Sequence, residues 1–429
     1  MAIRDIIIFT QFYPYTYYDV YFERELFELS KYYDRVFLIS GDPDSTIQQP
    51  TPANTRIYRF APSTQQRRKL FLLRHLFRID FVKEMWHISK TVATKNLVHA
   101  VWYALSSLEK SDRYKKFLSK LMSDENISAN NITVYSHWML EHAHAAGLIK
   151  RRFPGMKIVV RAHGSDLYFD RSPIGYLPLK KLIFEDADAI FFISENGRNY
   201  FQSFHRIRKT SAGKLRVSRL GLFAAKSPQL KEQGEKSFFR IVSNAHIQPL
   251  KRIDLIAEAL RDVNLRIEWI HFGDMHERTD AFNAFRKNVN ELLKENPNIT
   301  VMFKGGVTNR EIISFYEDNF VDLFINVSTT EGIPVSIMEA FSFGIPAIAT
   351  IVGGNPEIVN DNNGILLPAF LTETDLANAI RNFLLKTISE REKVRLNAFN
   401  TWKEKFNAEI NYPEFAQKIL SLSSTTIQK

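Results

Sequence analysis

Residues 321–346 read VDLFINVSTTEGIPVSIMEAFSFGIP and combine a strand, a loop and a helix. The run at 321–328 is apolar and of strand length, which predicts a buried strand. Pro334 suits the first turn of a helix, where its missing N–H costs nothing. Gly344 is typical of the position just after a helix. We therefore expect a buried strand, an acidic loop and a helix in that order.

The same alternation extends over most of the chain. In the first half, strands are predicted at 5–10, 35–40, 131–138, 157–164 and 188–194, with a helix at 22–33. In the second half, strands are predicted at 238–244, 265–273, 299–305 and 321–328, with helices at 252–263, 281–295 and 309–318. Continuous apolar strands separated by helices are typical of parallel sheets covered on both faces. The sequence thus predicts an α/β protein with two doubly wound, Rossmann-like domains.

The domain boundary is expected in a polar segment. Residues 222–237 contain Pro and Gly and no apolar period, which indicates a linker. It separates an N-terminal domain, 1–221, from a C-terminal domain, 238–395. A helical segment, 396–429, follows and is expected to pack back on the N-terminal domain. The default ligand site is a central cleft that the two domains face.

Composition excludes several classes of protein. Of the 429 residues, 45% are apolar, so the chain is globular, and none is cysteine, which excludes disulfides and thiolate chemistry. No apolar run reaches the length of a membrane-spanning helix, and the N-terminus is interpreted as a first strand, not a signal peptide. The simplest location is cytoplasmic. A net charge of +10 suits an anionic partner.

One stretch is both basic and aromatic. Residues 66–86, QRRKLFLLRHLFRIDFVKEMW, hold six Lys or Arg and two acids among apolar residues at helical spacing. Two interpretations have equal weight. The stretch is either an ordinary surface helix with a core-facing stripe, or a helix that lies on an anionic membrane, at the inner face of the cell membrane.

The acidic loop and helix suggest a ligand. Glu331 lies at the carboxyl end of a strand, and Glu339 lies in the helix that follows. The N–H groups of Val335 and Ser336, just after Pro334, are available to a phosphate. The two carboxylates can accept bonds from sugar and ribose hydroxyls. On spacing alone, a loop cap and a solvated helix residue remain the better-supported alternative.

The residues from 331 to 359, EGIPVSIMEAFSFGIPAIATIVGGNPEIV, resemble the glutamate-seven-glutamate motif of retaining glycosyltransferases of family 4, which have the GT-B fold. VSNAHIQPLKRIDLIAEAL, at 242–260, resembles the phosphate-binding strand, loop and helix of that family. FKGGVTNREIISFYED, at 303–318, and RAHGSDLY, at 161–168, also fit. The resemblance covers most of residues 130–395.

The resemblance implies roles for individual residues. Glu339 would accept bonds from the ribose hydroxyls, and Glu331 would face the donor sugar. The backbone around Pro334 and Val335 would meet sugar or phosphate, together with the helix N-terminus at Ser336. Lys251 would pair with the diphosphate as a point charge.

Two positions depart from the family pattern or stay open. His246 stands where the family usually has an arginine. It can donate a hydrogen bond to the diphosphate only when it is protonated or in the right tautomer. Arg252 is a candidate substitute, although a solvated helix residue is the favoured interpretation. His163 is a packed core histidine or, within the resemblance, a residue near the sugar and the reacting centre. Asp166 is expected to hold its loop.

The predicted activity is therefore that of a metal-independent, retaining glycosyltransferase of the hexosyltransferase type. Glu331, His163 and Lys251 are the catalytic candidates. The donor is a nucleotide sugar, UDP- or GDP-linked, and no other cofactor is expected. The sequence has no D-x-D pair at a strand end that would suggest a metal site. The acceptor is a glycan or a lipid-linked intermediate of cell-surface polysaccharide biosynthesis. No nucleic-acid partner is expected.

Three alternatives remain open at this point. A nucleotide-sugar epimerase or hydrolase of the same fold would need an N-terminal acid on the sugar. A basic nucleic-acid-binding protein would need a recognised binding motif. An inactive scaffold, binding a membrane or nothing, is the third, and the two glutamates and the lysine argue against it.

Overall fold

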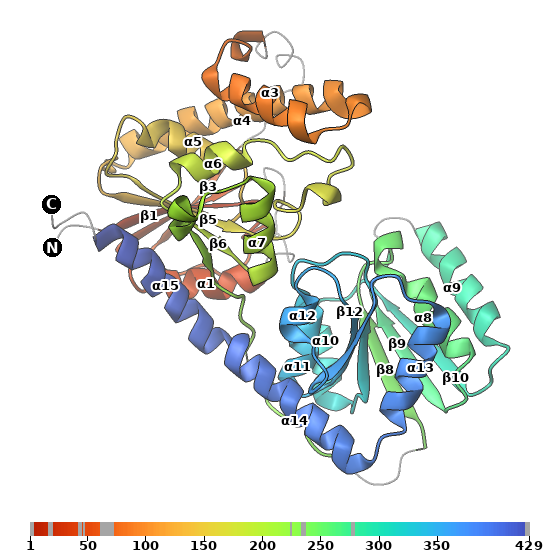
Figure 1. Ribbon diagram of the computed structural model, residues 1–429. Coiled ribbons are helices and arrows are strands. Elements are labelled where there is room, and N and C mark those ends of the chain that lie inside the picture. Colours follow the sequence, from red (N-terminus) through yellow and green to blue (C-terminus); the bar gives the residue numbers. More distant parts are fainter. Residues whose placement is uncertain are drawn as a thin grey trace. The chain divides into compact units, whose positions relative to one another are not determined.

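The computed structural model describes residues 4–15, 20–41, 45, 48–60, 73–223, 225–232, 237–275 and 279–424. The chain divides into two compact units (Figure 1). The first comprises residues up to Leu220 together with those from Ile410 onward, and the second runs from Gly221 to Glu409. The segment predicted as a linker, 222–237, lies inside the second unit and begins one residue after its start. No helix among these residues is long and apolar enough to cross a membrane.

The first unit is built on a parallel sheet with the strand order β3-β2-β1-β4-β5-β6-β7. The strands are β1 (Asp5–Thr10), β2 (Arg35–Ser40), β3 (Thr55–Arg59), β4 (Ile132–Ser136), β5 (Lys157–Ala162), β6 (Ala189–Phe192) and β7 (Leu215–Val217). The α-helices are α1 (Val20–Ser30), α3 (Ile79–Thr91), α4 (Leu97–Asp124), α5 (Glu141–Lys150), α6 (Lys180–Asp186), α7 (Glu195–Phe204) and α15 (Ala408–Ser424).

Helices cover both faces of this sheet because alternate strand residues point to opposite sides. In β1, Ile7 packs in a core with residues of α3 to α7, whereas Ile8 packs in a core with residues of α1 and α15. The ring of Phe415, in α15, lies 5.5 Å from that of Tyr135, in β4. The last helix of the chain is thus part of the first unit.

The second unit has a parallel sheet with the order β10-β9-β8-β11-β12-β13. Its strands are β8 (Phe239–Asn244), β9 (Ile267–Phe272), β10 (Ile299–Gly305), β11 (Leu323–Asn326), β12 (Ala347–Thr350) and β13 (Gly364–Leu367). Its helices are α8 (Ile253–Arg261), α9 (Thr279–Leu293), α10 (Asn309–Asp318), α11 (Val335–Ser342), α12 (Asn355–Ile358), α13 (Glu373–Leu384) and α14 (Ile388–Lys405). Both units are Rossmann-like, as predicted.

The sequence prediction differs from the structure in some elements. Strands β3, β7, β12 and β13 were not predicted, because they are only three to five residues long and lie toward the sheet edges. The helix expected over 66–86 is confirmed from Ile79 onward and is wrong for residues 73–78. A short 3₁₀ turn, Leu73–His75, comes first, and the α-helix begins only at Ile79. Residues 66–72 lie outside the described residues.

Candidate functional site

The candidate site of the second unit lies where the strand order of its sheet reverses. β8 and β11 are neighbours there, although other strands separate them along the chain. The loops that follow them, 245–252 and 327–334, leave the same edge because the strands are parallel. Ligands of doubly wound sheets bind beyond the carboxyl ends of the strands at such a point. The topology therefore brings Lys251 to Glu331.

These two residues form an ion pair. The Nζ atom of Lys251 lies 2.5 Å from Oε1 of Glu331, whose side chain is 9% exposed. The side-chain amide of Asn326, at the end of β11, donates to the same oxygen at 3.3 Å. An ammonium group has three protons, so Lys251 can donate to further acceptors while it holds Glu331. The pair thus offers a cation and a carboxylate at one point.

Arg252 ties the two loops together. Its Nε donates to the carbonyl of Val327 at 2.6 Å, and its Nη1 donates to that of Ala369 at 3.0 Å. The backbone N–H of Thr329 adds a bond to the carbonyl of Leu250 at 2.8 Å. The favoured interpretation of Arg252 as a solvated residue is therefore wrong, since its guanidinium is partly buried and bonded to backbone. A contact of Arg252 with phosphate stays a prediction.

Two glycines set the position of the Glu331 backbone. Gly353 has a φ of +50°, and a Cβ there would lie 1.7 Å from the carbonyl oxygen of Glu331. The N–H of Gly354 donates to the carbonyl of Gly332 at 2.7 Å, and a Cβ on Gly354 would lie 2.3 Å from that oxygen. No side chain larger than hydrogen fits at either position without moving the acidic loop.

Glu339 is buried, with 2% of its surface exposed, so its interpretation as a solvated helix residue is wrong. Its Oε1 accepts a hydrogen bond from the side-chain amide of Asn309, the first residue of α10. The Oγ of Ser342 donates to the Glu339 carbonyl at 2.7 Å. A buried carboxylate with one amide partner can still accept further bonds from hydroxyls.

The N-terminus of α11 lies between the two glutamates in sequence. Pro334 is its N-cap and supplies no capping side chain. Val335 and Ser336 follow as its first two residues, half-buried, and their N–H groups have no acceptor within a helix. The positive end of the helix dipole adds to these donors. An anion is favoured here, as the sequence predicts.

His246 follows β8, beside the end of β9. Its Nδ1 lies 3.5 Å from Oδ1 of Asp274, and the two side chains are 44% and 31% exposed. The residue after β9, Gly273, lies close to the residue after β8, Ala245. A Cβ on Gly273, which has a φ of +130°, would lie 1.9 Å from the carbonyl oxygen of Ala245. His246 thus lies beside the carboxylate of Asp274. Its contact with a diphosphate stays a prediction.

His163 belongs to the first unit, where it follows β5 at the carboxyl edge of that sheet. Burial lowers its pKa well below the usual value, so the ring is neutral at pH 7. The Nε2 atom lies 3.3 Å from the carbonyl oxygen of His137, which assigns the proton to Nε2 and leaves Nδ1 as an acceptor. The ring also contacts that of Trp138, at 4.2 Å between centroids.

Asp166 holds the loops around His163. Its two carboxylate oxygens accept the N–H groups of His163 and Met139, each at 2.7 Å. Lys180, itself buried, donates to the carbonyl of Met139. These contacts give Asp166 the loop-holding position that the sequence suggested.

A small cavity of about 230 Å³ opens beside these loops. Trp138, Asp166 and Lys180 line it, together with Tyr103 of α4 and Glu141 of α5. The indole N–H of Trp138 is buried and has no hydrogen-bond acceptor within the described residues. The cavity therefore combines an aromatic wall with charged groups at the carboxyl edge of the sheet.

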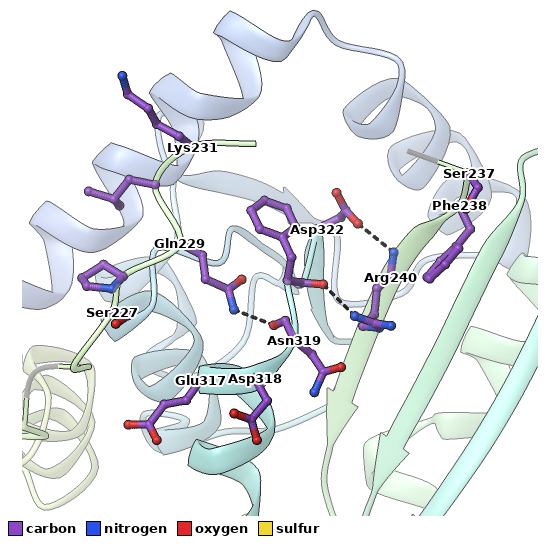
Figure 2. A pocket seen from close by; sticks show the side chains of 13 residues that line it. Ser227, Gln229, Lys231, Ser237, Phe238, Arg240, Glu317, Asp318, Asn319 and Asp322 are labelled. Atoms are coloured by element: carbon purple, nitrogen blue, oxygen red, sulfur yellow. Dashed lines mark hydrogen bonds between the residues drawn. The ribbon is translucent and has the colours of Figure 1, made fainter. Parts of the chain in front are cut away.

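A larger cavity, about 790 Å³, lies at the opposite, amino-terminal edge of the second unit's sheet (Figure 2). Its polar groups are largely used within the fold. Arg240 donates to the carbonyl of Phe320 at 3.2 Å, and the amide of Gln229 donates to those of Tyr316 and Asn319. These bonds anchor the segment that enters the unit. The cavity is separate from the loops that hold Lys251 and Glu331.

Sequence reasoning missed the residues that orient the two glutamates. Asn309 and Asn326 supply amide bonds, and Gly353 and Gly354 fix the loop backbone. A signal existed for Asn326, because it is a polar residue at the end of a buried strand. Asn309 carries no such signal, since its contact depends on tertiary packing. The described residues contain no group of three or more His, Asp or Glu side chains placed to hold a metal ion.

The second unit also matches a known family. Residues 226–401 fit the sequence profile of the family described as glycosyl transferases group 1. These residues therefore form a glycosyltransferase group 1 domain. The group 1 domain contains Lys251, Glu331 and Glu339, and hence all the donor-side residues described above.

Whole-chain comparisons agree with this. WcaL of Escherichia coli K12, a glycosyltransferase assigned to colanic acid biosynthesis, is 25% identical over 277 residues, which cover 62% of this chain and 64% of WcaL. The chain thus spans less than two thirds of the length of that relative. A glycosyltransferase of Rickettsia africae has a similar structure, with a TM-score of 0.65 and 14% identity over 99% of this chain and all of the other.

A third similar protein is HepE of Anabaena, whose structure was determined in complex with UDP and glucose. Its TM-score is 0.62, with 15% identity over 97% of this chain and 99% of HepE. Likeness at this identity concerns the fold. It confirms the predicted GT-B fold, in which both units are Rossmann-like. The second unit contains the group 1 domain.

Proposed function

We propose that this chain is a retaining glycosyltransferase that transfers a hexose from a nucleotide sugar to a glycan or lipid-linked acceptor. The observation that carries the proposal is the Lys251–Glu331 ion pair next to the uncapped N-terminus of α11. A cation and free N–H groups suit a diphosphate, and a carboxylate beside them suits sugar hydroxyls. The group 1 profile match supports the same activity.

In the proposed reaction, the bond between the anomeric carbon and the donor phosphate breaks, and a bond from that carbon to the acceptor oxygen forms. Lys251 and the N–H groups of Val335 and Ser336 stabilise the charge that develops on the departing diphosphate. Glu331 faces the positive charge on the sugar. The acceptor proton passes to a donor phosphate oxygen on the face that the leaving group leaves, so configuration is retained. These groups supply the positive charge without a metal ion.

Glu339 has a separate role in this proposal. Its buried carboxylate accepts bonds from the ribose hydroxyls, with Asn309 fixing its orientation. On the first unit, neutral His163 accepts a hydroxyl hydrogen bond through Nδ1 near the reacting centre. Both roles use the capacity of a carboxylate and of a neutral imidazole nitrogen to accept hydrogen bonds from hydroxyls.

The substrate class follows from the relatives. The name of WcaL refers to colanic acid, a polysaccharide, which supports an acceptor of cell-surface polysaccharide biosynthesis. HepE binds UDP and glucose, which supports a UDP-linked hexose before a GDP-linked one. A cytoplasmic location, with attachment to the inner face of the cell membrane, completes the proposal and is consistent with a chain that lacks cysteine.

The decisive experiment is a calorimetric titration with UDP-, GDP-, ADP- and dTDP-sugars, with and without EDTA. We expect one nucleotide class to bind the wild-type protein, independently of EDTA. The variant Glu339→Gln keeps the side-chain volume and should bind that class at least tenfold more weakly. Glu317→Gln, at the exposed end of α10, is the matched control and should bind normally.

Equal binding by the wild-type protein and the Glu339→Gln variant would refute the ribose role of Glu339. Absence of binding by every nucleotide sugar would refute the activity itself and favour the scaffold alternative. An EDTA-sensitive affinity would refute metal independence alone.

A further inference from the structure

Exposed apolar side chains are concentrated in one segment of the first unit, residues 77–102. Those with at least half of their surface exposed are Phe77, Ile79, Val82, Trp86, Val98 and Trp102. We call these six residues the α3–α4 face. No other large apolar side chain in the described part of this unit is exposed to that extent. A concentrated apolar patch of this kind marks an interaction surface.

Packing against the core of the unit uses other apolar residues of α3. α3 buries Phe81 and Ile88 against the core, and it places Ile79, Val82 and Trp86 on its other side, at positions i, i+3 and i+7. α4 packs against α3 (Figure 1), and its first turns carry the exposed Val98 and Trp102. Helix α3 therefore has one apolar side for the core and a second apolar side that the described residues of the unit leave exposed.

The exposed charges of the segment 73–103 are positive, although three of them pair with acids of α4 and α6: Arg74 with Glu109, Arg78 with Asp112, and Lys83 with Glu185. Residues 73–103 contain five Lys or Arg and two acids. Both acids, Asp80 and Glu84, are buried, with 2% of their surface exposed. Lys90 lies 3.7 Å above the ring of Trp86, and Lys95 is exposed between the two helices. The exposed charges of this segment are thus all basic, beside an aromatic and aliphatic surface.

The face adjoins the small cavity of the same unit. Tyr103, which is 40% exposed, follows Trp102 in α4 and also lines that cavity. Lys181 lies 5.2 Å from the ring centre of Trp86, and its neighbour Lys180 lines the cavity as well. Two residues that line the cavity, Tyr103 and Lys180, are therefore chain neighbours of residues at the α3–α4 face.

We propose that the α3–α4 face docks on an anionic lipid surface. Apolar and tryptophan side chains enter the boundary between headgroups and acyl chains, while lysines on the same side contact anionic headgroups. A second copy of the chain is less suitable, because two basic faces repel each other. Docking would bring the cavity that Tyr103 and Lys180 line to the membrane surface.

The test is flotation of the full-length protein with vesicles of pure phosphatidylcholine and of phosphatidylcholine with 30% phosphatidylglycerol (roughly the anionic range used to probe electrostatic docking). We expect binding to the anionic vesicles, weaker binding to the neutral ones, and loss of binding as salt rises. No nucleotide sugar is needed, so a negative result leaves the proposed transferase activity untouched.

Two variants test the apolar and the basic component. Phe77→Ser with Trp86→Ser should lower the partition coefficient at least tenfold. Phe370→Ser, which changes a side chain 97% exposed in the second unit, should not. Lys90→Glu with Lys95→Glu should lower binding to anionic vesicles about tenfold, whereas Lys287→Glu with Lys393→Glu, both exposed elsewhere, should leave most of it.

The result that would overturn the proposal is equally definite. Binding that is absent, or that survives both pairs of substitutions on the α3–α4 face, excludes this surface as the docking site. A dimer in sedimentation analysis that dissociates on Phe77→Ser with Trp86→Ser, without any vesicle binding by the wild type, assigns the face to a second copy instead.

Discussion

The ammonium group of Lys251 lies 2.5 Å from the carboxylate of Glu331, although the two residues are 80 positions apart in the chain. Neither residue is placed by local structure alone. Lys251 ends a 3₁₀ turn after β8, and Glu331 lies in the loop after β11. The crossover that makes β8 and β11 neighbours thus assembles the pair, and the surrounding backbone bonds hold it.

Removing the Lys251 charge should slow transfer more than it weakens the fold. We expect Lys251→Met to lower kcat/KM about a hundredfold, because a positioned cation on the leaving group is lost. The melting temperature should also fall, though less markedly, because Glu331, whose side chain is 9% exposed, loses its cation. Steady-state kinetics and a thermal melt measure the two effects.

Lys403→Met is the control for that experiment, because Lys403 is an exposed lysine of α14 in the same unit. It should keep normal kinetics. A Lys251→Met enzyme with unchanged kcat/KM would show that the leaving group is stabilised elsewhere.

Gly353→Ala should displace the acidic loop. The added Cβ would meet the Glu331 carbonyl oxygen at 1.7 Å, so the loop must move. We expect donor affinity to fall at least tenfold in a calorimetric titration. Gly305→Ala is a matched control, because Gly305 has a φ of +72° but open space around its Cβ position. That variant should show backbone strain of roughly 1–2 kcal/mol with normal donor affinity. Equal donor affinities for the two variants would contradict this account of Gly353.

Asn309→Ala should affect donor binding through Glu339. The amide of Asn309 orients the buried carboxylate, and its loss removes one hydrogen bond of about 1 kcal/mol. We expect an increase of about fivefold in the Kd for the donor, with kcat nearly unchanged. The helix start should survive, because Thr308 and Glu311 form a capping box of their own. Asn309→Asp, which places a second carboxylate beside Glu339, should be worse than alanine. An unchanged Kd in both variants would show that Glu339 is positioned without Asn309.

The fold was predictable because its signals are local. Strands such as β1 and β11 contain apolar runs of at least three residues, and the start of α11 is marked by Pro334. The short edge strands β3 and β13 escaped prediction because only half-buried positions distinguish them from loops. Their pairing with the neighbouring strands β2 and β12 is a tertiary contact that the local sequence does not indicate.

The candidate site was predictable only in its charged residues. The spacing of Glu331 and Glu339 is a sequence pattern, so both could be named. Their neutral partners could not, because the contact of Asn309 with Glu339 depends on how α10 packs beside α11. The position of Arg252 also escaped prediction, since its acceptors are backbone carbonyls of another loop.

Buried histidines should make the first unit sensitive to acid. Burial lowers the pKa of His142 and His205 to about 3 and that of His144 to about 4. In the unfolded chain these rings bind protons near pH 6.5, so the unfolded state binds more protons between that pH and the folded pKa values. Stability is complete above about pH 6.5 and falls as the pH drops, by roughly 1.4 kcal/mol per histidine at pH 5.5.

Calorimetric melts from pH 7.5 to 5 check this expectation. Changing His205 to Phe, which fits its aromatic surroundings at Phe201 and Phe204, should reduce the pH dependence by one proton. His99→Phe, at an exposed position of α4, serves as the control. A melting temperature of the first unit that stays constant from pH 7 to 5.5 would contradict the assignment of neutral, buried rings.

The last prediction concerns a buried ion pair beneath the His163 loop. Arg161 and Glu25 are at most 1% exposed, and the guanidinium donates to the carboxylate and, at 2.9 Å, to the Ser218 carbonyl. Glu25→Leu should lower the free energy of unfolding by roughly 3–5 kcal/mol, because it leaves a buried cation unpaired. Adding Arg161→Met should restore part of that loss, since it removes the cation itself. Urea unfolding of both single variants and the double variant gives the coupling energy. Additive losses would mean that the two charges are stabilised independently.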